Sequence, residues 1–195
     1  MNRTLSDTFF PGSRSCPYFR VGIVLLALLC TPSDLPASQK RSGGGDELFE
    51  NGGFEDGLNR WTPIDGGSGS TTIDVDSEIK ASGKNALKLV RKSPRLFPPD
   101  GVEMKLDRQG QQRKLIIEYK VRTDDSARAV VSLVALSSDG VFLVATVDQP
   151  ITSLRKFRRQ KLSLAVPPDT ERFVLSLAIQ GQGTVWYDDL RLRRK

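Results

Sequence analysis

Apolar and polar residues alternate along two segments in the second half of the chain. From Leu115 to Val121 every second residue is apolar, and the intervening positions from Glu118 to Arg122 are charged. The segment from Phe173 to Ile179 repeats the pattern, with smaller or polar residues between its apolar ones. A period of two with one polar face predicts an antiparallel β-sheet that is buried on one side only.

Short β-rich segments between turn signals fill the rest of the chain from Asp46 onward. Residues 128–137 and 141–147 flank Ser138-Asp139-Gly140, which predicts a hairpin, and Gly181-Gln182-Gly183 predicts a hairpin between the last two strands. No segment of this part keeps a helical period, and it contains no internal repeat. Roughly nine to eleven short strands at this spacing predict an all-β fold, a sandwich or a barrel.

The N-terminal part has the pattern of an export signal. An apolar run, Val21–Leu29, follows Arg20. The run is too short to span about 30 Å of hydrocarbon, which takes roughly 20 helical residues, so we expect a signal peptide. Residues 1–37 are then a leader, residues 38–45 a flexible glycine-containing linker, and residues 46–195 the folded domain. We expect the protein in the periplasm, at the cell surface or secreted.

The inventory of side chains excludes several classes of catalytic and metal site. The 195 residues include no histidine, which excludes a Ser-His-Asp triad, a Cys-His pair and a histidine-ligated zinc site. The two cysteines, Cys16 and Cys30, precede the domain, which therefore holds no disulfide. Lipidation at Cys30 is a less favoured alternative, because the bulky Leu29 stands where a lipoprotein signal has a small residue.

Basic residues are clustered although the excess of positive charge is modest. The formal net charge is +6, and the domain after Gly45 keeps 24 basic and 21 acidic residues. Residues 155–161 and 191–195 together hold nine basic residues and no acidic one. A charged edge strand that prevents aggregation is one interpretation, and a surface for anionic polymers is the other. We do not expect nucleic-acid binding, which would need exposed aromatic residues among these charges.

Three short motifs occur in order along the domain. Glu50–Gly57 contains Asn-Gly-Gly-Phe-Glu and is followed by Trp61, residues 81–89 form a small-Gly turn that enters a strand, and residues 184–192 place an Asp-Asp pair between apolar residues. Together they resemble the borders of the jelly-roll carbohydrate-binding modules of cellulases and xylanases, families four, nine and twenty-two. The resemblance implies an antiparallel jelly-roll β-sandwich of the galactose-binding-domain-like kind.

The resemblance also implies a structural calcium ion. Its ligands would be the carbonyl oxygens of Gly53, Ala81 and Lys84 and the carboxylates of Glu55 and Asp188. Oxygen ligands of these two kinds are those that calcium prefers. Alternatively, the two carboxylates accept backbone hydrogen bonds and bind no metal.

Few aromatic residues are available to stack on a sugar. We expect Trp61 and Trp186 to plug the ends of the sandwich and Tyr119 to lie in its core, which leaves Phe97 and Phe142 as candidates for exposure. Such a platform is poor for glycan binding.

Polar residues of a sheet face are the alternative glycan site. We expect Glu118, Lys120 and Arg122 on one strand and Gln180 on another to present hydrogen-bonding groups to a polysaccharide. The carboxylate pairs of the chain, such as Asp188-Asp189, show no spacing across a cleft, so we do not expect an enzyme.

Three functions follow, in order of preference. The first is an exported, non-catalytic, monomeric module that binds polysaccharide, anionic polymers included, and carries a calcium ion. The second is a cell-surface or matrix domain that contacts proteins or serves as structure without binding glycan, and the third is a small glycoside-active enzyme. A glycan array with the domain from Asp46 onward separates the first from the second.

Overall fold

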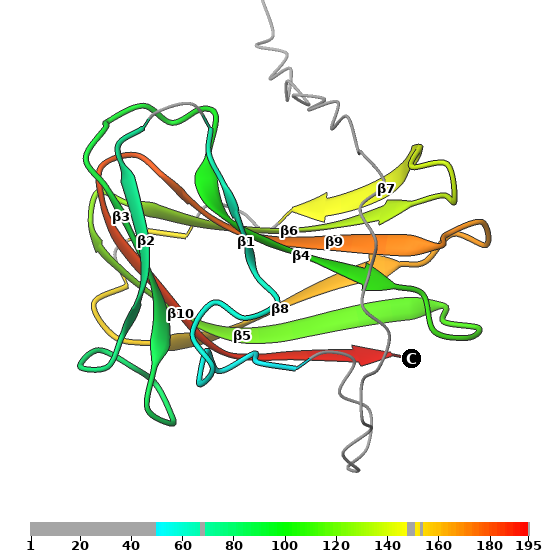
Figure 1. Ribbon diagram of the computed structural model, residues 1–195, viewed down its shortest axis with the longest axis horizontal. Helices are drawn as coiled ribbons and strands as arrows, with labels where there is room; N and C mark the ends of the chain where they lie inside the picture. The colour runs from blue at the N-terminus through cyan, green and yellow to red at the C-terminus, as the bar shows by residue number, and fades with distance from the viewer. Residues whose placement is uncertain (1–49, 67–68, 148–150, 153, 195) are drawn as a thin grey trace, which may run out of the picture. The chain divides into compact units, whose positions relative to one another are not determined.

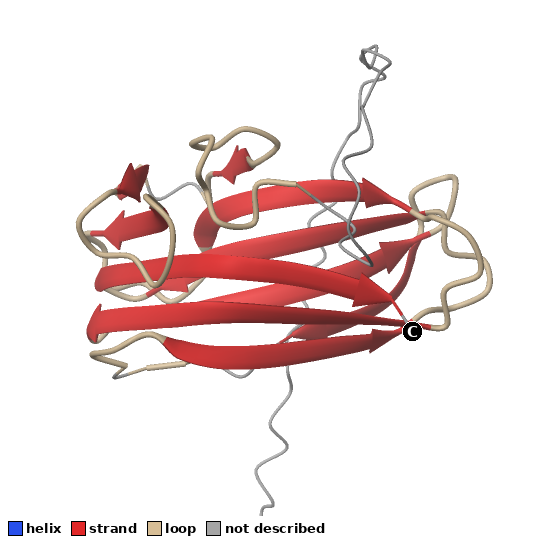
Figure 2. Ribbon diagram, turned by 90° about the horizontal axis from the view of Figure 1, so that it is seen from below, coloured by secondary structure: helices blue, strands red, loops and turns tan. Residues whose placement is uncertain are grey.

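The computed structural model describes most of the domain predicted from the sequence, namely residues 50–66, 69–147, 151–152 and 154–194. Within these ranges every helix or strand is a β-strand, and the strands form two antiparallel five-stranded sheets (Figures 1 and 2). The predicted leader and linker lie outside the described residues. In the described part of the chain no helix is long and apolar enough to cross a membrane.

Each sheet combines strands that are far apart in the sequence. The first sheet has the order β1 (Thr62–Ile64), β4 (Asp100–Asp107), β9 (Arg172–Gln180), β6 (Arg128–Leu136) and β7 (Phe142–Val147). The second sheet has the order β2 (Thr71–Asp76), β3 (Ala86–Arg91), β10 (Gly183–Arg194), β5 (Lys114–Asp125) and β8 (Arg158–Ala165). The last strand, β10, is therefore the central strand of its sheet.

The alternation predicted from the sequence is confirmed in both segments. Leu115, Ile117, Tyr119 and Val121 of β5 are fully buried, and so are the alternate apolar residues of β9. These side chains belong to one core between the two sheets, which is the arrangement of a β-sandwich. The predicted fold class is correct.

One of the two predicted hairpins is present and the other is not. β6 and β7 pair as an antiparallel hairpin, as expected. β9 and β10 belong to different sheets, so the segment from Gly181 to Gly183 carries the chain across the sandwich. Gly183 has a φ of 131°, and a Cβ there would lie 2.8 Å from the Asp124 carbonyl oxygen. Two turn glycines are equally compatible with a hairpin and with a crossing between sheets, which is why the hairpin predicted between the last two strands was wrong.

A buried ion pair joins the two sheets at one end of the core. Arg91 of β3 and Asp100 of β4 have side chains that are 0% and 2% exposed, and Arg91 Nε lies 3.4 Å from Asp100 Oδ2. The Arg91 Nη1 atom also donates hydrogen bonds to the carbonyl oxygens of Pro98 and Ile179, both at 3.1 Å. Asp100 accepts hydrogen bonds from the Gly66 N–H and from the Thr71 hydroxyl. Each charge is therefore compensated by groups of the other sheet.

We expect Asp100→Ala to lower the free energy of unfolding by about 3–5 kcal/mol, because it leaves the Arg91 charge buried without its partner. Urea unfolding monitored by circular dichroism measures this. Asp107→Ala is the control: its carboxylate pairs with Arg172 but is 81% exposed, so it should cost less than about 1 kcal/mol. Equal losses in the two variants would show that the buried pair has no special role.

Candidate functional site

The outer surface of the second sheet gathers the polar residues that the sequence singled out. Core residues alternate with outward-facing ones on β5, so Glu118, Lys120 and Arg122 point away from the core on three successive outward positions. Pairing places Arg159 of β8 opposite Lys120 and Lys161 of β8 opposite Glu118. We call this surface, formed by the outward side chains of β3, β10, β5 and β8, the second-sheet face.

The two basic segments of the sequence lie on either side of β5. Residues 158–161 belong to β8 and residues 191–194 to β10, and both strands pair with β5. Arg191 of β10 stands opposite Glu118. The sequence revealed both clusters, but only the long-range strand pairing shows that they form one surface.

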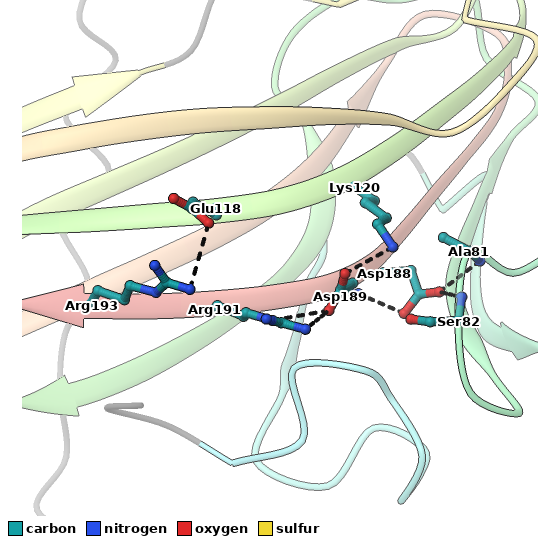
Figure 3. A network of polar contacts seen from close by, with 8 residues as sticks. All are labelled: Ala81, Ser82, Glu118, Lys120, Asp188, Asp189, Arg191 and Arg193. Carbon is teal, nitrogen blue, oxygen red and sulfur yellow. Dashed lines mark hydrogen bonds and ion pairs between the residues drawn. The ribbon is translucent and has the colours of Figure 1, made fainter. Parts of the chain in front are cut away.

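Ion pairs connect the charges of β5 and β10 (Figure 3). Lys120 Nζ lies 2.9 Å from Asp189 Oδ2, and Arg191 Nη2 lies 3.0 Å from Asp189 Oδ1. The Arg193 guanidinium is 4.0 Å from the Glu118 carboxylate. Burial would raise the pKa of Asp189, but hydrogen bonds and charge from Lys120 and Arg191 outweigh it and lower that pKa. Asp189 is therefore ionised and forms ion pairs with both Lys120 and Arg191.

Trp186 is buried as expected but not where the sequence placed it. It belongs to β10 between Val185 and Tyr187, whose side chains fill the core, so its own side chain points to the second-sheet face. The ring is only 4% exposed, and the Arg122 Cζ atom lies 4.9 Å from its centroid. The indole N–H donates a 3.0 Å hydrogen bond to Asp76 Oδ2. Trp61, in contrast, does close the core, with its ring 5.4 Å from that of Phe54.

Gln180 lies apart from the other three predicted glycan-binding residues. It ends β9 in the first sheet and is only 6% exposed, so its amide is not presented to solvent. Phe97 and Phe142 are exposed, as predicted, at 62% and 43%, and both are outside the second sheet. The aromatic residues available to a ligand are therefore scattered.

The central rows of the outer surface of the first sheet are uncharged over three adjacent strands, β9, β6 and β7. Its rows can be followed from the strand register: Ala178 opposite Val130, Ser176 opposite Ser132, and Val174 opposite Val134. The edge strand β7 adds Ala145 and Val147 to two of these rows. We call these residues the first-sheet face. The two outer surfaces of the sandwich thus differ in chemistry.

The residues implied as calcium ligands come together around the turn before β3. Asp188 Oδ2 accepts hydrogen bonds from the N–H groups of Ala81 at 2.7 Å and Ser82 at 2.8 Å (Figure 3). Glu55 Oε1 accepts one from the Lys84 N–H at 2.9 Å. A Cβ on Gly53 would lie 3.8 Å from Glu55 Oε1 and 3.9 Å from Asp188 Oδ1, so the two carboxylates flank one point.

These carboxylates have the charge and the oxygen donors that a hard cation prefers. Asp188 is fully buried, and burial raises its pKa although three backbone N–H groups oppose the shift. No ion pair with lysine or arginine offsets either carboxylate among the described residues. The described part of the chain has no cluster of three acidic or sulfur ligands, so carbonyl oxygens and water would have to complete a metal shell.

The carboxylates of Glu55 and Asp188 and the turn before β3 form what we call the carboxylate cradle, and a side chain at Gly83 would displace the Glu55 carboxylate from it. The φ of Gly83 is +57°, and a Cβ there would lie 2.0 Å from Glu55 Oε1. We expect Gly83→Ala to lower the melting temperature more than Gly57→Ala, whose φ is +59° but whose Cβ would meet nothing within 4 Å. The control bears only the left-handed backbone cost, about 1–2 kcal/mol. Scanning calorimetry measures both, and equal shifts would contradict the packing of Glu55 against this turn.

Comparison with known proteins shows the fold and not a family. No protein-family profile and no curated protein matches the sequence. The enzymatically active domain of bacteriophage CBA120 tailspike protein 4 superposes with a TM-score of 0.65 and 13% identity, covering 76% of this chain and 21% of that one. The chain therefore spans about a fifth of that protein's length.

Two smaller proteins are covered almost completely. The CBM22-1 xylan-binding domain of Paenibacillus barcinonensis Xyn10C has a TM-score of 0.55 and 16% identity, covering 79% of this chain and 97% of that one. A cyclase from Fischerella sp. TAU has a TM-score of 0.59 and 14% identity, covering 77% and 96%. The fold is therefore that of the carbohydrate-binding jelly-roll modules, and enzymes also use it.

Proposed function

We propose that the domain is an exported, non-catalytic module that binds an anionic polysaccharide on its second-sheet face. The observation that carries the proposal is the meeting of two basic segments on either side of β5. The fold shared with a xylan-binding domain supports carbohydrate as the partner. Cross-strand rows of cations would follow the repeating charges of an extended polymer.

The charges of this face favour an anion over a neutral chain. Lys120, Arg159, Lys161, Arg191 and Arg193 face outward, with Glu118 and Asp189 between them. Arg159 and Lys161 form no ion pair with a described residue and lie on the edge strand, where a ligand can reach them. A surface with one prevailing sign concentrates polymers of the opposite sign near it.

We expect the double variant Arg159→Ala, Lys161→Ala to bind sodium polygalacturonate roughly threefold to tenfold more weakly than the parent at low salt. The difference should shrink at about 0.5 M salt, because salt screens exposed charges. Isothermal titration or affinity electrophoresis measures this.

The control for this experiment removes two cations from the other sheet. Lys105→Ala, Arg128→Ala changes the net charge equally, and both residues are exposed in the first sheet. Equal weakening by both double variants would reduce the effect to net charge. A parent that binds neither polygalacturonate nor neutral xylan would reject the proposed function.

We also propose that Glu55 and Asp188 hold a structural calcium ion, with carbonyl oxygens such as that of Gly53 completing the shell. The support is the convergence of the two carboxylates and the buried charge of Asp188. Calcium takes about 6–8 oxygen ligands. The ion would hold the N-terminal segment, the turn before β3 and β10 together.

Calcium should raise the melting temperature of the parent and a chelator should lower it, because a ligand that binds only the folded state adds about 2.7 kcal/mol at a hundred times its Kd. Glu55→Gln and Asp188→Asn should abolish the difference.

The pH dependence follows from Asp188. Since burial raises the pKa of Asp188, protonation relieves the cost of its buried charge, and the chelated protein should become more stable as pH falls through that pKa. Calcium stabilisation is lost over the same range. Equal calcium responses in parent and variants would place the ion elsewhere.

A second candidate function is protein interaction through the first-sheet face. Its rows of valine, alanine and serine carry no charge, and Val147 on the neighbouring edge strand is 56% exposed. Ala178 and Val130 are buried, so the accessible apolar surface of this face lies toward the β7 edge. Exposed apolar patches are typical of contact sites. This function fits a cell-surface or matrix domain, and it becomes the leading one if the parent binds no polysaccharide.

A further inference from the structure

Trp186 occupies the middle of the second-sheet face, between two cations. The strand register places Lys88 of β3 directly opposite it on one side and Arg122 of β5 on the other. Directly opposite residues of an antiparallel pair lie about 4.5–5.5 Å apart on the same face. The indole is thus the one aromatic ring of this row, and Arg122 lies over it with Cζ 4.9 Å from the ring centroid.

The two cations beside Trp186 are held differently. Lys88 Nζ lies 3.2 Å from Asp76 Oδ2, the same atom that accepts the indole hydrogen bond. Arg122 forms no ion pair with a described residue, and its Nε atom is buried without a hydrogen-bond acceptor. A charged donor without an acceptor is unfavourable, and the contact with the ring compensates for it only in part. Arg122 is therefore the group on this face that an incoming carboxylate would stabilise most.

We propose that Trp186 is an occluded stacking platform for a hexuronate ring, and that Arg122 is both its cover and the anchor of the uronate carboxylate. On binding, the guanidinium would leave the indole and pair with the carboxylate, and the apolar face of the pyranose would take its place on the ring. A flat apolar face beside a carboxylate attached directly to a ring carbon fits this exchange, whereas a sulfate ester fits only the charge. This inference rests on the proposed function and names its ligand class.

The test compares one polymer in two charge states. Sodium polygalacturonate and its fully methyl-esterified form share a backbone, and only the first carries carboxylates. Arg122→Ala should weaken binding of polygalacturonate roughly tenfold, because it removes a charge-assisted pair. The same variant should bind the methyl ester at least as tightly as the parent does, since the ring is now open. Trp186→Leu should weaken binding of both polymers, and Trp186→Phe should weaken it less.

Fluorescence reports the cover independently of binding. In a Trp61→Phe background, Trp186 is the only tryptophan of the chain. Acrylamide should then quench its emission several-fold more strongly in Arg122→Ala than in the parent. Arg128→Ala, which removes an exposed arginine of the first sheet, is the control and should leave both the quenching and the binding ratio unchanged. Melting curves show that each variant is folded.

The outcomes separate this inference from the proposed function. If the parent binds polygalacturonate and Trp186→Leu binds it equally well, Trp186 is no platform, while the polysaccharide site stands. If Arg122→Ala weakens both polymers alike and leaves quenching unchanged, Arg122 is no cover and the inference is overturned. Stronger binding of dextran sulfate than of polygalacturonate by the parent, unaffected by Arg122→Ala, would also reject the uronate. A parent that binds none of the polymers rejects both proposals.

Discussion

The register of β10 is the constraint on which both the core and the surface site depend. Up to Asp188 its odd-numbered residues face the core, which places Trp186 and Asp188 on the outside. A bulge between Asp188 and Arg191, with Asp189 at a φ of 53°, then shifts the alternation so that Leu190 and Leu192 fill the core. Without that extra residue the basic end of β10 would point inward.

The bulge also connects distant parts of the chain. The Leu190 N–H donates a hydrogen bond to the Gly52 carbonyl oxygen, which fixes the N-terminal segment against β10. On the same stretch, Asp188 holds the turn before β3 and Asp189 holds two cations of the second-sheet face. Adjacent acidic residues therefore serve different purposes: Asp188 fixes the backbone of the turn that covers it, and Asp189 pairs with cations of the second-sheet face.

Local sequence patterns predicted the strands, but long-range strand pairing determines which side chains share a surface. Alternation in β5 depends on near neighbours, so the sequence located Glu118, Lys120 and Arg122 on an outward surface. The crossing at Gly181–Gly183 and the outward side of Trp186 depend on which sheet each strand joins, which no local pattern contains. Gln180 has the right alternation but is buried at the end of β9. The convergence of Glu55 and Asp188 could be predicted only because the motifs that contain them resemble those of known modules.

The turn between β2 and β3 contacts Trp186 at its start and the carboxylates of Asp188 and Glu55 at its end. At its start Asp76 accepts hydrogen bonds from the Glu78 and Ile79 N–H groups and from the Trp186 indole. Burial opposes ionisation of Asp76, but these donors together with Lys88 outweigh it and lower its pKa, so its stabilising contribution is lost progressively as pH falls below the ordinary range of an aspartate. At the end of the turn, Asp188 and Glu55 hold the backbone. A cation that stiffens the cradle would therefore also fix Asp76, and with it the orientation of the ring on the second-sheet face.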